Sequence, residues 1–322
     1  MKRTIYIAVS ILAIAVFIAV VGFHASWESR DGKAHEYVIA SAADLDSLDI
    51  CPIARLALTD IRPGYYRFEA RMPYRHLIRM LRHGRQVDYR LVLSSNLRTL
   101  PDVAGYIGQH MQTDSTSLQT ALRQHVDTTD WTEQTAICLF IPNTYFVHWT
   151  DPADQVIARM EREYQRFWNA ERRARADSLG YSPTEVMTLA SIVSCETTRR
   201  AEWPKIASLY LNRLRKGMPL QADPTAVYAS GDFTTQRVGP EHIQTESAYN
   251  TYRHAGLPPG PIRCTDPAAI DSVLWAPKTN YLYMCANPDW SGTHVFTTNF
   301  SDHRRVASAF RHELNRRNIQ SR

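Results

Sequence analysis

Residues 182–198 read Ser-Pro-Thr-Glu-Val-Met-Thr-Leu-Ala-Ser-Ile-Val-Ser-Cys-Glu-Thr-Thr, and this stretch carries clear signals for the start of a helix. Ser182 is followed three residues later by Glu185, which is a capping-box pattern. Pro183 occupies the first helical position, where a missing N–H costs nothing. We therefore predict a helix that begins directly after Ser182.

Glu196 occupies an unusual position near the end of this predicted helix. It lies seven residues after Leu189, four after Ile192 and three after Val193, so it shares a helical face with apolar side chains. A carboxyl group among aliphatic groups has its ionised form desolvated and its pKa raised, which suits a general acid. The alternative interpretation is a glutamate at a fraying helix end that reaches into water.

Length and composition bound the possible architectures and partners. The chain has 322 residues, of which 44% are hydrophobic, so it can form one large domain or two to three smaller ones. The net charge of +5 arises from 37 basic and 32 acidic side chains, and the arginines are interleaved with acids. This balance does not require a nucleic-acid partner, and we expect none.

The cysteines argue against a zinc site because they are widely spaced and form no C-x-x-C pair. An odd number of thiols leaves at least one of them free. Cys264 and Cys285 could form a disulfide in an oxidising compartment, but the sequence does not decide whether they are close enough. We expect neither a metal nor a cofactor. The five cysteines are Cys51, Cys138, Cys195, Cys264 and Cys285.

An unbroken apolar run from Ile5 to Phe23 follows Lys2 and Arg3, and it is long enough to cross a bilayer as a helix. A cleaved signal peptide is the alternative, but the run is longer than an ordinary signal core and no good small-residue cleavage site follows it. The positive charges place residues 1–4 in the cytoplasm. We predict a transmembrane helix over residues 5–23, with the rest of the chain outside the cytoplasm.

The remainder of the sequence predicts an α+β fold in three parts. Residues 30–95 alternate short strands and a helix, residues 96–150 are a polar connecting subdomain, and residues 151–322 are rich in helices. One long amphipathic helix is predicted over residues 154–177, and another begins at Pro204 and ends before Gly217. In the N-terminal module, the row Arg75, Arg79 and Arg82 is typical of a solvated helix face, although it could also meet anionic lipid or wall polymer.

Three polar clusters, at residues 220–225, 248–253 and 256–261, lie in segments that we expect to be loops. Aromatic rings cover the apolar faces of sugars and amides bind their hydroxyls, so such loops are typical of a sugar-binding groove. The alternative is that their Pro and Gly residues only mark turns. His294, beside a predicted strand, could be catalytic but is more typical of a structural histidine. The candidate substrate-binding residues are Gln221, Asp223, Thr225, Tyr249, Asn250, Thr251 and Tyr252.

Six motifs in the C-terminal half follow one another in a distinctive order and spacing. They are Ala190-Ser191-Ile192-Val193 with Glu196-Thr197, Asn212-Arg213-Leu214 with Gly217-Met218, Leu220-Gln221 with Asp223-Pro224-Thr225, Tyr249-Asn250-Thr251-Tyr252, Gly256-Leu257-Pro258-Pro259-Gly260, and Pro277-Lys278-Thr279 before Tyr281-Leu282-Tyr283. Together they resemble the endolytic murein transglycosylases, the YceG-like family. Pro63-Gly64-Tyr65 and Pro142-Asn143-Thr144-Tyr145 extend the resemblance more weakly toward the N-terminus. Relatives commonly carry Glu-Lys where this chain has Ser194-Cys195.

The resemblance implies a single-pass inner-membrane protein whose periplasmic catalytic domain, residues 151–322, carries the catalytic glutamate at Glu196 on a helix. It implies that residues 30–95 form a LysM-like module. The implied reaction cuts nascent peptidoglycan strands at the β-1,4 bond between N-acetylmuramic acid and N-acetylglucosamine, leaves 1,6-anhydro ends and terminates strand elongation. Glycan strands and cell-wall synthesis enzymes are the implied partners.

Two other functions fit parts of the sequence. A hydrolytic muramidase needs a second carboxylate, and Asp223 is the candidate, although Asp before Pro224 is also typical of a turn. A non-catalytic peptidoglycan-binding scaffold could use the same groove. Glu196 on an apolar face argues against the scaffold, because a binding protein gains nothing from a desolvated acid.

Overall fold

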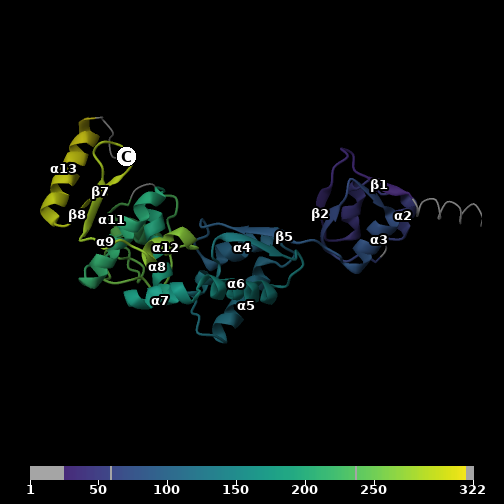
Figure 1. Cartoon of the computed structure of the whole chain (residues 1–322), viewed down its shortest axis with the longest axis horizontal. Coiled ribbons are helices and arrows are strands. Elements are labelled where there is room, and N and C mark those ends of the chain that lie inside the picture. The colour runs from purple at the N-terminus through teal and green to yellow at the C-terminus, as the bar shows by residue number, and fades with distance from the viewer. Residues whose placement is uncertain (1–24, 59, 236–237, 317–322) are drawn as a thin grey trace, which may run out of the picture. The chain divides into compact units, whose positions relative to one another are not determined.

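The computed structural model describes residues 25–58, 60–235 and 238–316 of the chain, and it is an α+β structure as the sequence predicts (Figure 1). The predicted cytoplasmic residues 1–4 and transmembrane helix 5–23 lie outside these ranges. Within them, no helix is both long enough and apolar enough to cross a membrane.

The helices and strands have the following bounds. They are β1 Ser26–Glu28, β2 His35–Ile39, the 3₁₀ helix η1 Ala42–Ser47, α2 Pro52–Leu56, β3 Gly64–Phe68, β4 Arg71–Pro73, α3 Tyr74–His83, β5 Tyr89–Leu93, α4 Leu100–His110, α5 Ser115–Asp127, η2 Ala136–Leu139, β6 Asn143–Val147, α6 Ala153–Phe167, α7 Ala170–Leu179, α8 Pro183–Glu196, η3 Arg200–Glu202, α9 Trp203–Arg215, α10 Asp223–Ser230, α11 Pro240–Gln244, α12 Pro267–Leu274, β7 Tyr283–Ala286, β8 His294–Thr297 and α13 Phe300–Arg316.

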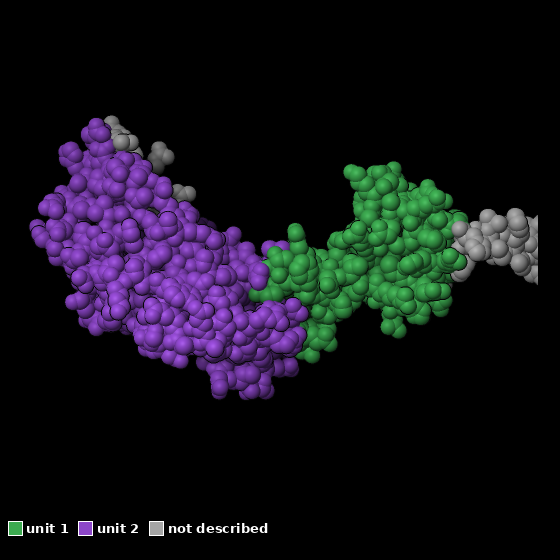
Figure 2. Space-filling model, in the orientation of Figure 1, with its two compact units in different colours: residues 1–91, 106–118, 144–156 green, residues 92–105, 119–143, 157–322 purple. Residues whose placement is uncertain are grey.

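The chain forms two compact units, which Figure 2 shows in different colours. Unit 1 comprises the described residues up to Leu91 together with 106–118 and 144–156, and unit 2 comprises 92–105, 119–143 and the described residues from Ile157 onward. The segment 96–150, expected as a connecting subdomain, is therefore divided between the two units.

Unit 1 contains two antiparallel strand pairs that enclose an apolar core. β1 pairs with β4, and β2 pairs with β3 in a register that places His35 opposite Phe68. The ring of Trp27 meets the ring of Phe68 edge-on, with the centroids 5.3 Å apart. Helix α3 buries Leu77 and Leu81 in the same core. Its three arginines are exposed, as expected for a solvated face.

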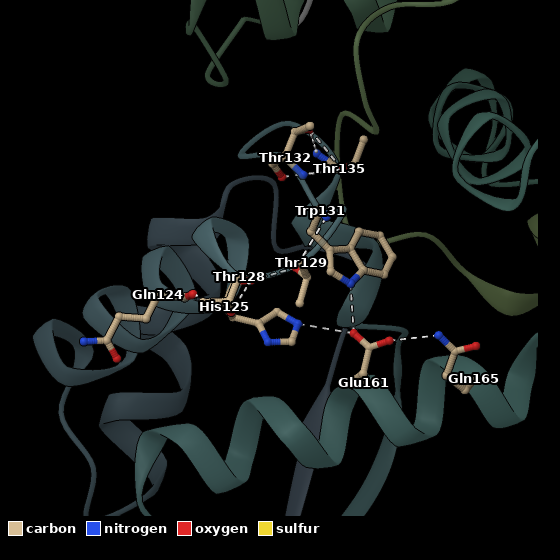
Figure 3. A network of polar contacts seen from close by, with 9 residues as sticks. All are labelled: Gln124, His125, Thr128, Thr129, Trp131, Thr132, Thr135, Glu161 and Gln165. Carbon is tan, nitrogen blue, oxygen red and sulfur yellow. Dashed lines mark hydrogen bonds and ion pairs between the residues drawn. The ribbon is translucent and has the colours of Figure 1, made fainter.

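In unit 2, a polar network on Glu161 ties the segment before η2 to helix α6 (Figure 3). The Glu161 carboxylate accepts hydrogen bonds from Trp131 Nε1 at 2.9 Å and from Gln165 Nε2 at 2.8 Å, and His125 Nε2 lies 3.3 Å from it. Because the Trp131 indole N–H and the His125 ring both have the Glu161 carboxylate as a partner, the segment can pack on α6 without leaving the indole donor unpaired.

The single helix predicted over residues 154–177 is wrong, because the structure has two helices, α6 and α7, in its place. The break falls at Asn169, whose side chain accepts a hydrogen bond from Arg172 N at 2.9 Å. This is an N-cap, and it begins a new helix where the apolar pattern alone suggests continuation.

The helix predicted from residue 183 is confirmed as α8. Ser182 Oγ accepts from Glu185 N at 3.3 Å, while the Glu185 carboxylate accepts from Ser182 N at 2.8 Å, so the capping box is complete. The side chains from Val186 to Val193 are buried, and α8 packs against α7, α9, α10 and α12. Helix α8 is therefore the central helix of unit 2.

Other predicted features near the site are confirmed in part. Helix α9 has Pro204 in its first turn, and Gly217 beyond its end has φ 65°, a left-handed conformation that glycine adopts at no steric cost. Strands β7 and β8 pair antiparallel, and α13 packs on them. The loop expected at residues 220–225 instead runs into helix α10 at Asp223, because Pro224 fits the first turn of a helix. All five cysteines are free thiols.

Candidate active site

A cavity of about 360 Å³ in unit 2 is lined by residues from seven separate segments. It lies where the C-terminal end of α8 meets α9, α10 and the β7–β8 hairpin. The residues that line it are Glu196, Leu209, Tyr210, Arg213, Leu220, Gln221, Asp223, Tyr252, Met284, Cys285, Ala286, His294 and His303.

Glu196 is the last residue of α8, and its side chain is partly exposed at this cavity. Protein atoms enclose the carboxyl group elsewhere, and this burial raises the pKa of Glu196 from 4.5 to about 7. A hydrogen bond from Tyr210 Oη and the charge of Arg213 lower that pKa, whereas the charge of Asp223 raises it. Glu196 is therefore protonated in a large share of molecules near neutral pH, as a general acid must be.

Tyr210, on α9, gives Glu196 a defined orientation. Its hydroxyl donates to Glu196 Oε1. Burial, and then the neighbouring Glu196, raise the pKa of Tyr210 well above its usual value, so the phenol stays neutral and remains a donor. Because the phenol donates to one carboxyl oxygen, the other oxygen is the one that can exchange a proton with a ligand.

Asp223 lines the same cavity as Glu196 and is the first residue of α10, where a helix N-terminus favours negative charge. Tyr252 Oη donates to Asp223 Oδ1 at 2.5 Å. Burial and this carboxylate raise the pKa of Tyr252, which keeps the phenol a donor. The structure thus brings Glu196, Asp223 and Tyr252, all of them predicted site residues, to one cavity.

Gln221 also lines this cavity, and its backbone adopts an uncommon conformation. Its φ of 49° is in the left-handed region, where few residues other than glycine are found. The conformation is supported by a hydrogen bond from Gln221 N to Thr251 O at 3.1 Å. Strained backbone of this kind concentrates at functional sites, which is consistent with the expected role of Gln221.

Thr225, Asn250 and Thr251 do not present a surface to a ligand, contrary to the expectation from sequence. All three side chains are buried, with at most 1% of each exposed. The Thr225 and Thr251 hydroxyls bond each other at 2.7 Å, and Asn250 Nδ2 donates to three backbone carbonyls. Their polar groups hold the loop that carries Tyr252, so we assign them a structural role.

Tyr249 faces a different cavity from the one at Glu196. Its ring lies 4.7 Å from the ring of Tyr228, and both rings line a cavity of about 400 Å³ together with residues of α4 and α5. Tyr249 and Tyr252, three positions apart in the chain, therefore line different cavities.

Several lining residues were not among the predicted site residues. Arg213 lies in the last turn of α9, where basic side chains usually face solvent, but its side chain is buried. Tyr210 lies fourteen positions after Glu196, and no local pattern signals their contact. His294 is held by the buried Glu202, which accepts from His294 N at 2.8 Å and lies 2.9 Å from Nδ1. In the sequence, Arg213 belongs to the motif Asn212-Arg213-Leu214 and His294 lies beside a predicted strand, whereas Tyr210 has no such signal.

In the ranges that the structure describes, no three histidine, cysteine, aspartate or glutamate side chains gather in a way that could hold a metal ion. The cavity instead offers an acid of raised pKa, a second carboxylate and several hydrogen-bond donors. This combination can transfer a proton to a bound oxygen atom and take one back.

Comparison with known proteins identifies relatives. Residues 35–309 match the model of the YceG-like family. An endolytic murein transglycosylase of Bacillus subtilis is 39% identical over 126 residues, which is 39% of this chain and 34% of the relative. One from Streptococcus pneumoniae is 29% identical over 167 residues, or 50% of this chain and 29% of the relative. The match thus spans about a third of the length of these curated relatives.

A solved structure of a YceG-like protein from Listeria monocytogenes shares the fold. It has a TM-score of 0.61 and 23% identity, and the alignment covers 85% of this chain and 99% of that one. The family match extends from unit 1 through the cavity at Glu196 to α13. The chain therefore belongs to the YceG-like family.

Proposed function

We propose that this protein is a peptidoglycan lytic transglycosylase in which Glu196 is the catalytic acid and base. The observation that carries the proposal is the Glu196 carboxyl, which opens on a cavity and has a pKa raised to about 7 by burial. The curated relatives named endolytic murein transglycosylase support murein as the substrate.

The reaction needs a proton donor and a base at one position in succession. Glu196 gives its proton to the glycosidic oxygen as the bond from that oxygen to C1 of N-acetylmuramic acid breaks. The resulting carboxylate then accepts the proton of the C6 hydroxyl as that oxygen bonds to C1 and closes the 1,6-anhydro ring. No water is consumed, and Glu196 returns to its protonated form, so one residue can serve both steps.

A hydrolytic muramidase is the second candidate function, and the position of Asp223 favours it. Asp223 lines the same cavity as Glu196 and would stabilise positive charge at C1 or direct a water molecule. In the transglycosylase, Asp223 is engaged by Tyr252 and assists only through its charge.

The products distinguish the two reactions. We expect purified full-length chain in detergent to convert uncrosslinked glycan strands into fragments that end in 1,6-anhydro-N-acetylmuramic acid, because the sugar's own hydroxyl attacks C1. Mass spectrometry detects these ends as one water molecule lighter than reducing ends. Reducing ends alone, together with an inactive but folded Asp223→Asn variant, would establish the muramidase instead.

The proposal includes a membrane anchor at residues 5–23 and an extracytoplasmic catalytic part that acts on nascent strands, alongside cell-wall synthesis enzymes. Residues 30–95 would be a LysM-like module that holds the glycan. The charge distribution of Lys2 and Arg3 before the apolar run supports this topology. Protease added to intact spheroplasts should then degrade the C-terminal region, and protection of that region would contradict the topology.

A non-catalytic wall-binding scaffold is a weaker candidate. Such a protein would bind glycan and leave its length unchanged. The raised pKa of Glu196 has no role in it, because a binding site for neutral sugar gains nothing from a desolvated acid.

A further inference from the structure

Arg213 is a buried cation whose hydrogen bonds all go to neutral acceptors. Only 8% of its surface is exposed. Nε donates to Leu282 O at 2.7 Å, and Nη1 donates to Leu220 O at 2.8 Å, to Pro219 O at 3.2 Å and to Gln221 Oε1 at 3.4 Å. These bonds connect α9 to the loop before α10 and to the residue before β7.

Arg213 forms no close ion pair with a carboxylate of the described residues, although its charge lowers the pKa of Glu196. Among the described residues, no Asp or Glu oxygen lies within 4.0 Å of its guanidinium, whereas buried charges in proteins are normally paired. Arg213 is also the only lysine or arginine among the described residues that line the cavity, which holds the two acids Glu196 and Asp223.

One nitrogen of Arg213 remains available. In the described part of the chain Nη2 makes no hydrogen bond, it is not one of the buried atoms that lack a partner, and Arg213 lines the cavity. The other two nitrogens are fixed by backbone carbonyls, and Tyr283 lies under the guanidinium at 5.3 Å. Nη2 is therefore a rigid, charged donor directed by its own protein contacts.

The neighbouring wall of the cavity is also incompletely bonded. His303 of α13 stacks on Tyr283 with centroids 5.3 Å apart, and its buried Nδ1 has no partner within the described ranges. Burial, and then the charge of Arg213, lower the pKa of His303, so its ring is neutral at pH 7. Within the described ranges, Arg213 Nη2 and His303 Nδ1 therefore have no hydrogen-bond partner from the protein.

We propose that Arg213 Nη2 is a binding group for the lactyl carboxyl oxygen of N-acetylmuramic acid, and that it distinguishes this sugar from N-acetylglucosamine. The assignment rests on the proposed function. The lactyl ether is what differs between the two sugars of murein, and it ends in a carboxylate or, where a stem peptide is attached, in a carbonyl oxygen. A desolvated guanidinium donor is well suited to either oxygen.

The charges in the cavity favour an acidic substituent of the sugar only near Arg213. Glu196 after proton transfer and Asp223 both repel a carboxylate, whereas Arg213 supplies the compensating positive charge. Placing the lactyl group at Arg213 therefore orients the muramic acid residue relative to Glu196 and fixes which of the two alternating bonds is cut.

The test is a binding measurement in the Glu196→Gln background, which prevents turnover. The probes are a peptide-free muramic-acid-containing tetrasaccharide, the same molecule with its lactyl carboxyl reduced to an alcohol, and an N-acetylglucosamine tetramer. Calorimetry should show that the carboxyl-bearing probe binds about ten- to a hundredfold more tightly than the reduced probe, as expected for a charge-assisted hydrogen bond.

A second substitution, Arg213→Met, should remove this difference while affecting the N-acetylglucosamine tetramer little. If Arg213 has only a structural role, its loss should weaken the binding of all three probes by a similar factor. The ratio of the affinities for the carboxyl-bearing and reduced probes therefore separates the two roles. Arg215→Gln is the matched control, because Arg215 lies on the same helix but is exposed and outside the cavity, and it should leave the ratio unchanged.

The comparison of the two muramic probes needs no variant at Arg213, so it stands even if Arg213→Met does not fold. Equal affinity for the carboxyl-bearing and reduced probes overturns the lactyl subsite and leaves the proposed function intact. Absence of binding to every probe, with no glycan cleavage by the unmodified chain, overturns both.

Discussion

We expect Glu196→Gln to abolish glycan cleavage while the protein remains folded. Glutamine has nearly the same volume and can still accept the Tyr210 hydrogen bond, but it cannot give up and take back a proton. The loss of general acid and base action is typically about 10²- to 10⁴-fold or more in rate. Release of anhydro-ended fragments from uncrosslinked strands measures the effect.

Two matched controls accompany this variant. Glu185→Gln alters the capping box at the other end of α8 and should cost about 1 kcal/mol or less of stability, with activity retained. Tyr210→Phe removes the bond that lowers the pKa of Glu196, so it should stay active and move the loss of activity to higher pH. A folded Glu196→Gln protein that cleaves at near the parent rate would disprove the assignment.

Glu196→Gln should also change how the free energy of unfolding depends on pH. The pKa of Glu196 is raised from 4.5 to about 7 in the folded state, so between these values the native protein binds more protons than the unfolded chain. The free energy of unfolding of the parent therefore falls as pH rises through this window. The variant lacks this term, so it should be more stable than the parent by about 1 to 3 kcal/mol at pH 8 and by almost nothing at pH 4. Urea unfolding at the two pH values measures the difference.

Asn250→Ala should strongly destabilise unit 2, because the Asn250 side chain is fully buried and both polar atoms of its amide form hydrogen bonds. Its Nδ2 donates to the carbonyls of His242, Ile243 and Thr245, and its Oδ1 accepts from Tyr252 N at 3.1 Å. Alanine leaves these groups unpaired and opens a cavity, which should lower the free energy of unfolding by about 2 to 4 kcal/mol. Thermal unfolding measures the loss.

The control for this prediction is Gln221→Asn, because Gln221 is exposed and lines the cavity of Glu196. Asparagine tolerates the left-handed backbone, so this variant should retain its stability while glycan binding weakens. If Asn250→Ala is as stable as the parent and only loses affinity for glycan, then Asn250 is a substrate-binding residue, as its sequence context suggests, and the structural role is wrong.

The sequence by itself determined those features that depend on interactions within a few residues. The capping box of Ser182 and Glu185 predicts where α8 begins, and Pro204 and Gly217 predict the limits of α9, because capping and backbone conformation are local properties. The period of the apolar side chains also placed Glu196 on the buried face of its helix. The apolar pattern failed at Asn169, because this N-cap side chain begins a new helix where the pattern predicts one continuous helix.

Only the tertiary structure decided which polar residues form the site. Tyr210 and Arg213 line the cavity of Glu196, Asn250 is fully buried, and Tyr249 lines another cavity, although Tyr249 and Asn250 are adjacent in one polar segment. These outcomes depend on contacts such as that of Arg213 with Leu282, which are 69 positions apart. Whether a polar side chain meets solvent, substrate or a backbone carbonyl is set by how distant segments pack, and no periodicity along one segment contains that information.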